Sequence, residues 1–249
     1  TLFYRTKHSV TLTPAGRILL DGYPKITTSF QNLMDKAKLA NEGKIGTIRI
    51  GLQEGQNLDE DLVYELKRFK EKYPNIEVMI ACHPYNQLLK MLETGEIDFG
   101  FSLYFDAADY NALEVKVIKE MESYIVVSAD NEMCASDQMD FEELNNHTLL
   151  IVGSGVVSSG AWFVKKQCRE NHINPAKIKL IDRYSTLHLL LVLNEGFAFM
   201  NQNTWFTDSK LRFFPMPKGN TVTRVASWRG NNDNPVLSIL LEEIHLFGK

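Results

Sequence analysis

The sequence predicts an α/β protein in which two lobes follow one long N-terminal helix. Three observations support this prediction. An apolar period of 3.5 residues runs through residues 13–43, apolar strands alternate with amphipathic helices through residues 45–101, and a second block of the same alternation follows Ala129. The chain has 249 residues, of which 44% are hydrophobic and 23% charged. This is the composition of a globular protein, and the length allows more than one compact unit.

The first predicted element is a helix over residues 13–43. Thr13 can accept a hydrogen bond as N-cap, Pro14 suits the first helical position, and Gly43 suits the end because glycine adopts the left-handed conformation without strain. Pro24 removes one backbone donor and predicts a kink. One narrow apolar stripe runs along the helix: Leu19, Tyr23, Ile26, Phe30, Leu33 and Ala37. The stripe favours a seam between two helices, although an amphipathic helix on a globular core has a similar period.

Residues 45–101 predict three strands that alternate with two helices. The expected strands cover residues 45–52, 76–82 and 97–101. The expected helices cover residues 58–73 and 86–94, and they end at Pro74 and Gly95. Strands that alternate with helices in this way pair in parallel and are joined by right-handed crossovers.

The rest of the chain predicts a second lobe and a return to the first. Expected strands cover residues 113–119, 124–128, 148–152, 177–182, 196–200 and 222–228. Expected helices cover residues 141–144, 161–171, 186–194 with Ser185 as its cap, and 235–247. The layout predicts two Rossmann-like subdomains of periplasmic-binding-protein type, the first over residues 45–126 and 229–249 and the second over residues 127–228.

Several short motifs stand at fixed spacing in the two predicted regions: Leu2-Phe3-x-Arg5, Val10-x-Leu12-Thr13-x-x-Gly16, Ile50-Gly51, Phe69-x-x-x-Tyr73-Pro74, and Leu92-x-x-Gly95-Glu96-Ile97-Asp98-Phe99-Gly100. Together they resemble motifs of LysR-type transcriptional regulators. By this resemblance, residues 1–12 are the remnant of the wing of a winged helix-turn-helix, and residues 13–43 are a linker helix that pairs two subunits. The helix-turn-helix itself would precede Thr1. The remainder resembles the effector-binding domain of these regulators.

The N-terminal residues are also the basic part of the chain. Residues 1–44 carry seven Lys and Arg against three Asp and Glu, whereas the remainder carries 20 against 28. An acidic body repels nucleic acid, so this division fits a protein that contacts DNA only through its N-terminal module. The resemblance implies that Arg5, Lys7 and His8 contact DNA phosphates or the minor groove. A solvated turn explains these three residues equally well.

Two further helices are candidates for subunit contacts. Residues 186–194 are apolar nearly all round, which predicts either full burial in their own lobe or a second partner. The resemblance implies that this helix packs on helix 58–73 of another subunit in a head-to-tail homodimer or homotetramer. The candidate dimerisation residues are Leu19, Tyr23, Ile26, Phe30 and Leu33 of the linker helix, Leu62 and Leu66 of helix 58–73, and Leu187, Leu190 and Leu191 of helix 186–194.

A ligand site is expected between the lobes, where the carboxyl ends of parallel strands meet. Four loops reach this place, over residues 53–56, 84–86, 154–159 and 201–203, and by resemblance the same loops line the effector cavity. The candidate contacts are Gln53, Glu54, Gly55, Gln56, Tyr85, Asn86, Ser154, Gly155, Ser158, Ser159, Asn201 and Gln202. Because Glu54 is their one charged member, they predict a small polar or anionic effector held by neutral donors.

The Gly/Ser loop from Gly153 to Gly160 has three interpretations. It follows a strand and opens a helix, where free N–H groups favour an anion or another polar group. It also resembles a dinucleotide phosphate loop with Asp182 as the ribose acceptor, but it lacks the GxGxxG pattern and Asp182 lies too far along the chain. The third interpretation is a flexible turn.

The remaining chemistry of the sequence favours a protein that is not an enzyme. The six histidines lack metal-ligand spacing, and no nucleophile or phosphate-loop motif is present, so neither a metal nor a cofactor is expected. Cys82, Cys134 and Cys168 form no CxxC pair, which favours a reducing, cytoplasmic compartment, and a redox pair of the last two is disfavoured. The alternative function is a free-standing solute-binding protein for transport, which would have no use for residues 2–43.

Overall fold

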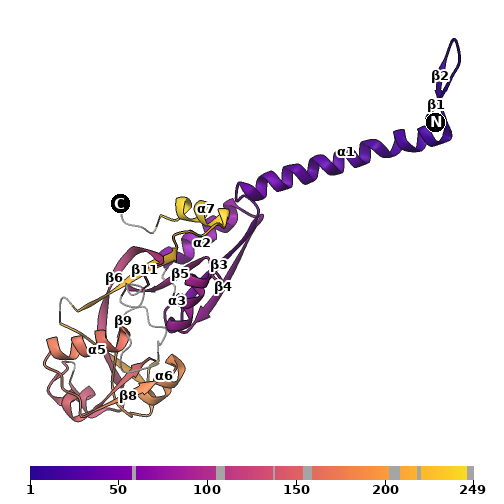
Figure 1. Cartoon of the computed structure of the whole chain (residues 1–249). Helices are drawn as coiled ribbons and strands as arrows, with labels where there is room; N and C mark the ends of the chain where they lie inside the picture. The colour runs from indigo at the N-terminus through magenta and orange to yellow at the C-terminus, as the bar shows by residue number, and fades with distance from the viewer. Residues whose placement is uncertain are drawn as a thin grey trace.

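The computed structural model shows a two-lobed body from which one long helix projects, with a small hairpin at the far end of that helix (Figure 1). The structure describes residues 1–57, 60–104, 110–136, 138–153, 159–201, 208–217 and 220–245. Within these residues, every helix is too short or too polar to span a lipid bilayer.

The projecting helix, α1 (Pro14–Asn41), begins and ends as the sequence predicts. Strands β1 (Phe3–Arg5) and β2 (Val10–Leu12) form the antiparallel hairpin before it. Thr13 is the N-cap, and its side-chain oxygen accepts a hydrogen bond from the backbone N–H of Gly16 at 3.0 Å. Gly43 has a φ of 69°, the left-handed conformation expected just after a helix.

The apolar stripe of α1 is largely exposed. Leu19, Tyr23, Ile26, Phe30 and Leu33 are 55%, 66%, 68%, 62% and 63% exposed. The interpretation as an ordinary core helix is therefore wrong for this chain, and the stripe is available to another molecule. The helix continues through Pro24 without interruption, and the Thr27 hydroxyl donates to the carbonyl oxygens of Tyr23 and Pro24 at 3.1 and 3.0 Å.

Lobe I contains the predicted alternation of strands and helices. Its elements are β3 (Gly46–Gln53), α2 (Glu60–Lys72), β4 (Ile76–His83), α3 (Tyr85–Thr94), β5 (Phe99–Leu103) and α7 (Pro235–Glu243). As expected, β3 pairs in parallel with β4 on one side and β5 on the other. Large apolar side chains of β3, α2 and α7 fill the core between them, among them Ile48, Phe69 and Leu240.

Two long strands connect the lobes. β6 (Leu113–Ser128) is one strand of 16 residues, so the prediction of separate strands over 113–119 and 124–128 is wrong. Its first part pairs with β11 (Thr221–Arg229), and this pairing continues through Glu120 and Glu122, which keeps the intervening residues extended. Because β11 also pairs with β5, residues 221–228 belong to the sheet of lobe I, as expected of a strand that returns to the first unit. The predicted boundary at residue 228, which placed them in the second subdomain, is therefore wrong.

Lobe II is built on the second part of β6. Its elements are the 3-10 helices η1 (Glu132–Ala135) and η2 (Glu143–Asn146), β7 (Thr148–Val152), α5 (Ser159–Glu170), β8 (Lys177–Ile181), α6 (Tyr184–Val192), β9 (Ala198–Asn201) and β10 (Leu211–Pro215). β7 pairs in parallel with β8, while β9 and β10 pair antiparallel with β6. The sequence did not predict β10. Ser185 is not the cap of α6, since the helix begins one residue before it, after Arg183.

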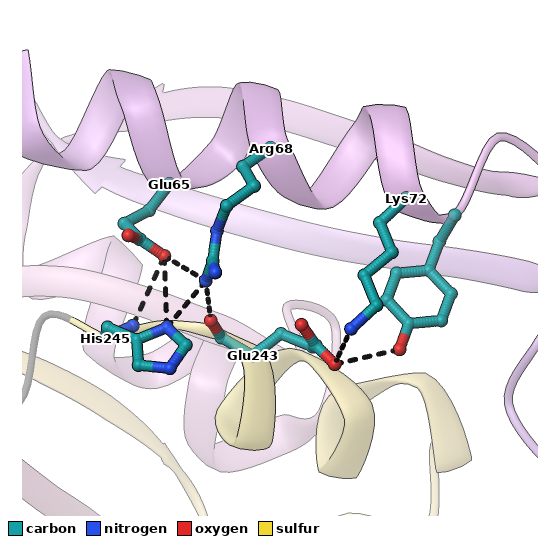
Figure 2. A network of polar contacts seen from close by, with 6 residues as sticks. Glu65, Arg68, Lys72, Glu243 and His245 are labelled. Carbon is teal, nitrogen blue, oxygen red and sulfur yellow. Dashed lines mark hydrogen bonds and ion pairs between the residues drawn. The ribbon is translucent and has the colours of Figure 1, made fainter.

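A polar network holds the last helix of lobe I in place (Figure 2). On α2, Arg68 Nη2 lies 2.6 Å from Glu65 Oε2 and donates to the backbone carbonyl of Glu243, at the end of α7. Lys72 Nζ and the Tyr73 hydroxyl both donate to Glu243 Oε1, at 2.6 and 3.0 Å. The lysine hydrogen bond lowers the pKa of Glu243, and Glu243 in turn raises the pKa of Lys72. The network joins the C-terminal half of α2 to the end of α7.

Candidate ligand site between the two lobes

A cavity of about 80 Å³ lies where the two lobes meet. Lobe I contributes the ends of β3, β5 and β11 to its wall, lobe II contributes β7, β9, α5 and α6, and the crossing strand β6 contributes Ser123. This is the predicted place for a ligand, because the loops that follow parallel strands converge there. Its volume is that of about six water molecules, which suits a small metabolite.

The loop after β3 forms the lobe I side of the cavity. Gln53 is buried, and its Oε1 accepts a hydrogen bond from the backbone N–H of Leu103 at 3.2 Å. Arg224 of β11 is also buried and donates to the carbonyl oxygen of Asn57 at 2.7 Å. The backbone N–H of Glu54 donates to the carbonyl of His83 at 2.8 Å. These bonds connect the loop to β5, β11 and β4. They hold the loop in the position from which Gln56 faces lobe II.

Two contacts cross directly from one lobe to the other. Asn201 Nδ2, at the end of β9, donates to Gln56 Oε1 at 3.1 Å. Gly55 has a φ of 82° and lies against the ring of Tyr184, the first residue of α6. A Cβ at position 55 would lie 2.4 Å from Cγ of that ring, so only glycine allows this approach. Any change in the angle between the lobes must alter both contacts.

Two polar side chains in the cavity wall were not predicted as ligand contacts. Ser123 and Gln167 are 4% and 5% exposed, and within the part of the chain that the structure describes Ser123 Oγ and Gln167 Oε1 have no hydrogen-bond partner. Most buried polar groups in proteins are paired, so these two are groups that a molecule in the cavity would satisfy. In the sequence, Gln167 shares one face of α5 with Gly160, Phe163 and Val164, but helical spacing alone does not show that this face lines a cavity.

The predicted effector contacts have three outcomes. Gln53, Gln56 and Asn201 line the cavity, whereas Glu54 and Gly55 belong to the loop but do not form the wall. Residues 84–86 are not a loop, because Pro84 caps α3 and the helix begins at Tyr85, and the side chains of Tyr85 and Asn86 lie outside the described structure. Ser159 begins α5, with its side chain likewise not described. Ser154, Gly155, Ser158 and Gln202 lie outside the described residues, which leaves the three interpretations of the Gly/Ser loop open.

The surroundings of Cys134 and Cys168 disfavour formation of the thiolate. Burial raises the pKa of the Cys168 thiol to about 11 and also raises that of Cys134. A protonated thiol is a poor nucleophile, so neither position favours oxidation. Among the described residues, no group of three His, Cys, Asp or Glu side chains is placed to hold a metal ion.

The residues of α2 and α6 proposed for subunit contacts are mostly buried within their own lobe. Leu62, Leu66, Leu187 and Leu191 are buried in the core of their own chain, so the prediction that they meet another subunit is wrong for these four side chains. They were misassigned because an apolar helix position does not show which face is inward. Leu190 is half-buried. The outward apolar side chains are Leu189 and Leu193 near the end of α6 and Tyr64 on α2, which are 56%, 60% and 64% exposed.

The predicted DNA contacts Arg5, Lys7 and His8 lie at the tip of the hairpin, and all three are exposed. The turn between the strands is held by the Thr6 side-chain oxygen, which accepts from the backbone N–H of Ser9 at 3.0 Å. The hairpin therefore presents basic side chains at the end of α1 that is farthest from the body (Figure 1).

These features define a two-lobed ligand-binding body with a cavity between its lobes, carried on a helix with an exposed apolar stripe. The family model for the LysR substrate binding domain matches residues 41–245. The chain therefore belongs to the LysR substrate-binding domain family.

Known relatives agree with this assignment. The chain is 34% identical over 100 residues to YcgK of Bacillus subtilis, an uncharacterized HTH-type transcriptional regulator. The aligned region covers 39% of this chain and 30% of that protein. It is 27% identical over 199 residues to the HTH-type transcriptional regulator XapR of Escherichia coli, over 80% of this chain and 66% of that protein. The chain thus spans less than two thirds of the length of either relative.

Solved structures confirm the fold. CbnR, a LysR family transcriptional regulator, superimposes with a TM-score of 0.72 at 17% identity, over 98% of this chain and 84% of that chain. The BenM effector binding domain with its effector benzoate superimposes with a TM-score of 0.62 at 18% identity, over 80% of this chain and 90% of that chain. The periplasmic-binding-protein-like α/β fold predicted from the sequence is therefore confirmed.

Proposed function

We propose that this chain is the effector-sensing and subunit-pairing part of a LysR-type transcriptional regulator that binds DNA and acts in the cytoplasm. The observation that carries the proposal is the combination of an inter-lobe cavity with the exposed stripe on α1. A free-standing solute-binding protein has a use for the cavity but none for a projecting apolar helix. The relatives named above are HTH-type regulators, and CbnR has been solved with its target DNA.

The proposed mechanism is a shift between inter-lobe angles. A ligand that binds the conformation with one inter-lobe angle more tightly than another increases the population of that conformation. The size of the shift is set by the difference in binding free energy. The contacts of Gln56 with Asn201 and of Gly55 with Tyr184 hold the angle observed here. A ligand in the adjoining cavity acts on both, since Gln56, Tyr184 and Asn201 are part of its wall.

The junction between the body and α1 transmits the change. A Cβ at Gly43 would lie 2.6 Å from the carbonyl oxygen of Pro235, so the end of α1 lies directly against the start of α7. The network of Figure 2 holds α7 on α2. Lobe I and the end of α1 therefore form a rigid unit, and a rotation between the lobes of one subunit displaces lobe II relative to α1 and to any subunit bound there.

Subunit pairing would use the stripe of α1 first. Its five large side chains are more than half exposed, and burial of each contributes about 1.5–3 kcal/mol when complete. We propose that the outer face of α6, with Leu189 and Leu193, provides a second contact with the α2 face of another subunit, which also displays Tyr64. Exposed apolar patches of this kind mark protein interfaces.

The coding sequence upstream of Thr1 tests the proposal. A helix-turn-helix module that continues into the β1–β2 hairpin supports the regulator, and the protein that carries it should bind DNA with an affinity that falls steeply with salt. A secretion signal in that position would contradict the proposal and favour the solute-binding protein.

A further inference from the structure

Two unpaired polar groups in the inter-lobe cavity define what its ligand must offer. Gln167 Oε1 is a carbonyl oxygen, so it can only accept a hydrogen bond, whereas the Ser123 hydroxyl can donate or accept. Both side chains are more than nine-tenths buried, both line the cavity, and neither atom has a partner in the described protein. A molecule that fills the cavity without a donor would leave Gln167 Oε1 buried and unpaired, which costs binding free energy.

The face of α5 shows how a ligand would lie. Gly160, Phe163, Val164 and Gln167 all line the cavity, and their spacing places them in one row along the helix. The row is about 10 Å long from Gly160 to Gln167, at 1.5 Å per residue. Its middle is apolar, and Leu187 and Phe199 of the same wall are apolar as well. The body of the ligand should therefore be apolar, with its donor at the Gln167 end.

The charge of the wall is the third constraint. The lining residues that the structure describes include no Asp, Glu, Lys, Arg or His. A charged ligand would be buried there without a counter-ion from these residues, and unpaired buried charges are strongly disfavoured. The neutral side-chain amides of Gln53, Gln56 and Asn201 suit an uncharged partner.

We infer that this cavity takes an uncharged small molecule with an apolar body and a hydrogen-bond donor, such as a primary amide, directed at Gln167. The inference rests on the proposed sensing function of the cavity and narrows its ligand class. It narrows the sequence-based expectation of a small polar or anionic effector to its uncharged polar alternative. The competing class is a carboxylate held at the opposite end of the row, where the N-terminus of α5 favours negative charge.

The first test needs no ligand. If Gln167 Oε1 and Ser123 Oγ are unpaired, replacing them by apolar groups of similar size should stabilise the ligand-free chain. We expect Gln167→Met and Ser123→Ala each to raise the thermal midpoint by about 2–4 °C. Ser227→Ala is the matched control, because Ser227 Oγ is also buried and unpaired but does not line the cavity. It should raise the midpoint too. A lower midpoint for Gln167→Met would show that its amide is already satisfied and would overturn the inference.

The second test compares amides with carboxylates of the same skeleton by ligand-observed NMR. The probes are benzamide and benzoate, cyclohexanecarboxamide and cyclohexanecarboxylate, and hexanamide and hexanoate, each at millimolar concentration. We expect amides to bind more tightly than their carboxylates. Gln167→Met should weaken amide binding about tenfold, the value of one good hydrogen bond, whereas Ser227→Ala should leave it unchanged.

Each other outcome has a definite meaning. Tighter binding of the carboxylates, or amide binding that is insensitive to Gln167→Met, overturns the inferred ligand class but leaves the sensing cavity intact. The absence of binding by every probe overturns both the ligand class and the proposed function of the cavity.

Discussion

The contact between Gly55 and Tyr184 predicts that one methyl group would disturb the arrangement of the lobes. In Gly55→Ala, the new Cβ would lie 2.4 Å from Cγ of Tyr184, far inside a normal contact. The residue would also have to keep a φ of 82°, which costs a side-chain-bearing residue about 1–2 kcal/mol. Relief of the overlap adds about 1–3 kcal/mol.

We therefore expect Gly55→Ala to lower the free energy of unfolding by about 2–5 kcal/mol, and differential scanning calorimetry should show a midpoint roughly 10 °C lower. Tyr184→Ala separates the two terms because it removes the ring but not the backbone strain. In that background, Gly55→Ala should cost only the strain, about 1–2 kcal/mol. Equal costs in both backgrounds would refute the contact and with it this arrangement of the lobes.

Two further predictions concern ionisation. Lys72 lowers the pKa of Glu243 below its usual 4.5, so the ion pair contributes stability above pH 4.5 that is lost as the pH falls through the lowered pKa. Thermal midpoints of the wild-type protein and Glu243→Gln should therefore differ most above pH 4.5 and converge in acid, and a constant difference would contradict the pairing. Burial raises the pKa of Cys168 to about 11, whereas Cys82 is exposed. Iodoacetamide in mildly alkaline buffer should alkylate Cys82 first and reach Cys168 only on unfolding, and mass spectrometry of the peptides would reveal the opposite order.

Local signals in the sequence predicted most elements of the fold. Thr13, Pro14 and Gly43 bound α1 because each satisfies the backbone at a helix end, and these local requirements do not depend on the rest of the chain. The strand and helix alternation of lobe I was predictable for the same reason. β6 was predicted as two strands because its polar residues Glu120 and Glu122 interrupt the apolar pattern, although pairing with β11 keeps them extended. β10 was not predicted because its extended conformation depends on pairing with β6, which is distant in the sequence.

The candidate site was predictable in position but only partly in composition. Gln53 and Asn201 end strands and Gln56 lies just after one, so topology could place all three at the cavity. Ser123 lies in the middle of a crossing strand and Gln167 in the middle of a helix, and neither has a local pattern that shows it faces a cavity. The side of α6 that faces inward depends on which neighbours pack on it, so Leu187 and Leu191 could not be distinguished from Leu189 and Leu193.

Sedimentation equilibrium tests the central claim that two subunits meet along the stripe of α1. Phe30→Glu places a charge in the proposed seam, while Thr28→Glu places the same charge on the opposite face, since two residues turn a helix by about 200°. The account predicts that the wild-type protein and Thr28→Glu are dimers or larger and that Phe30→Glu associates about a hundredfold more weakly. A monomeric wild-type protein, or equal association of the two variants, would contradict it.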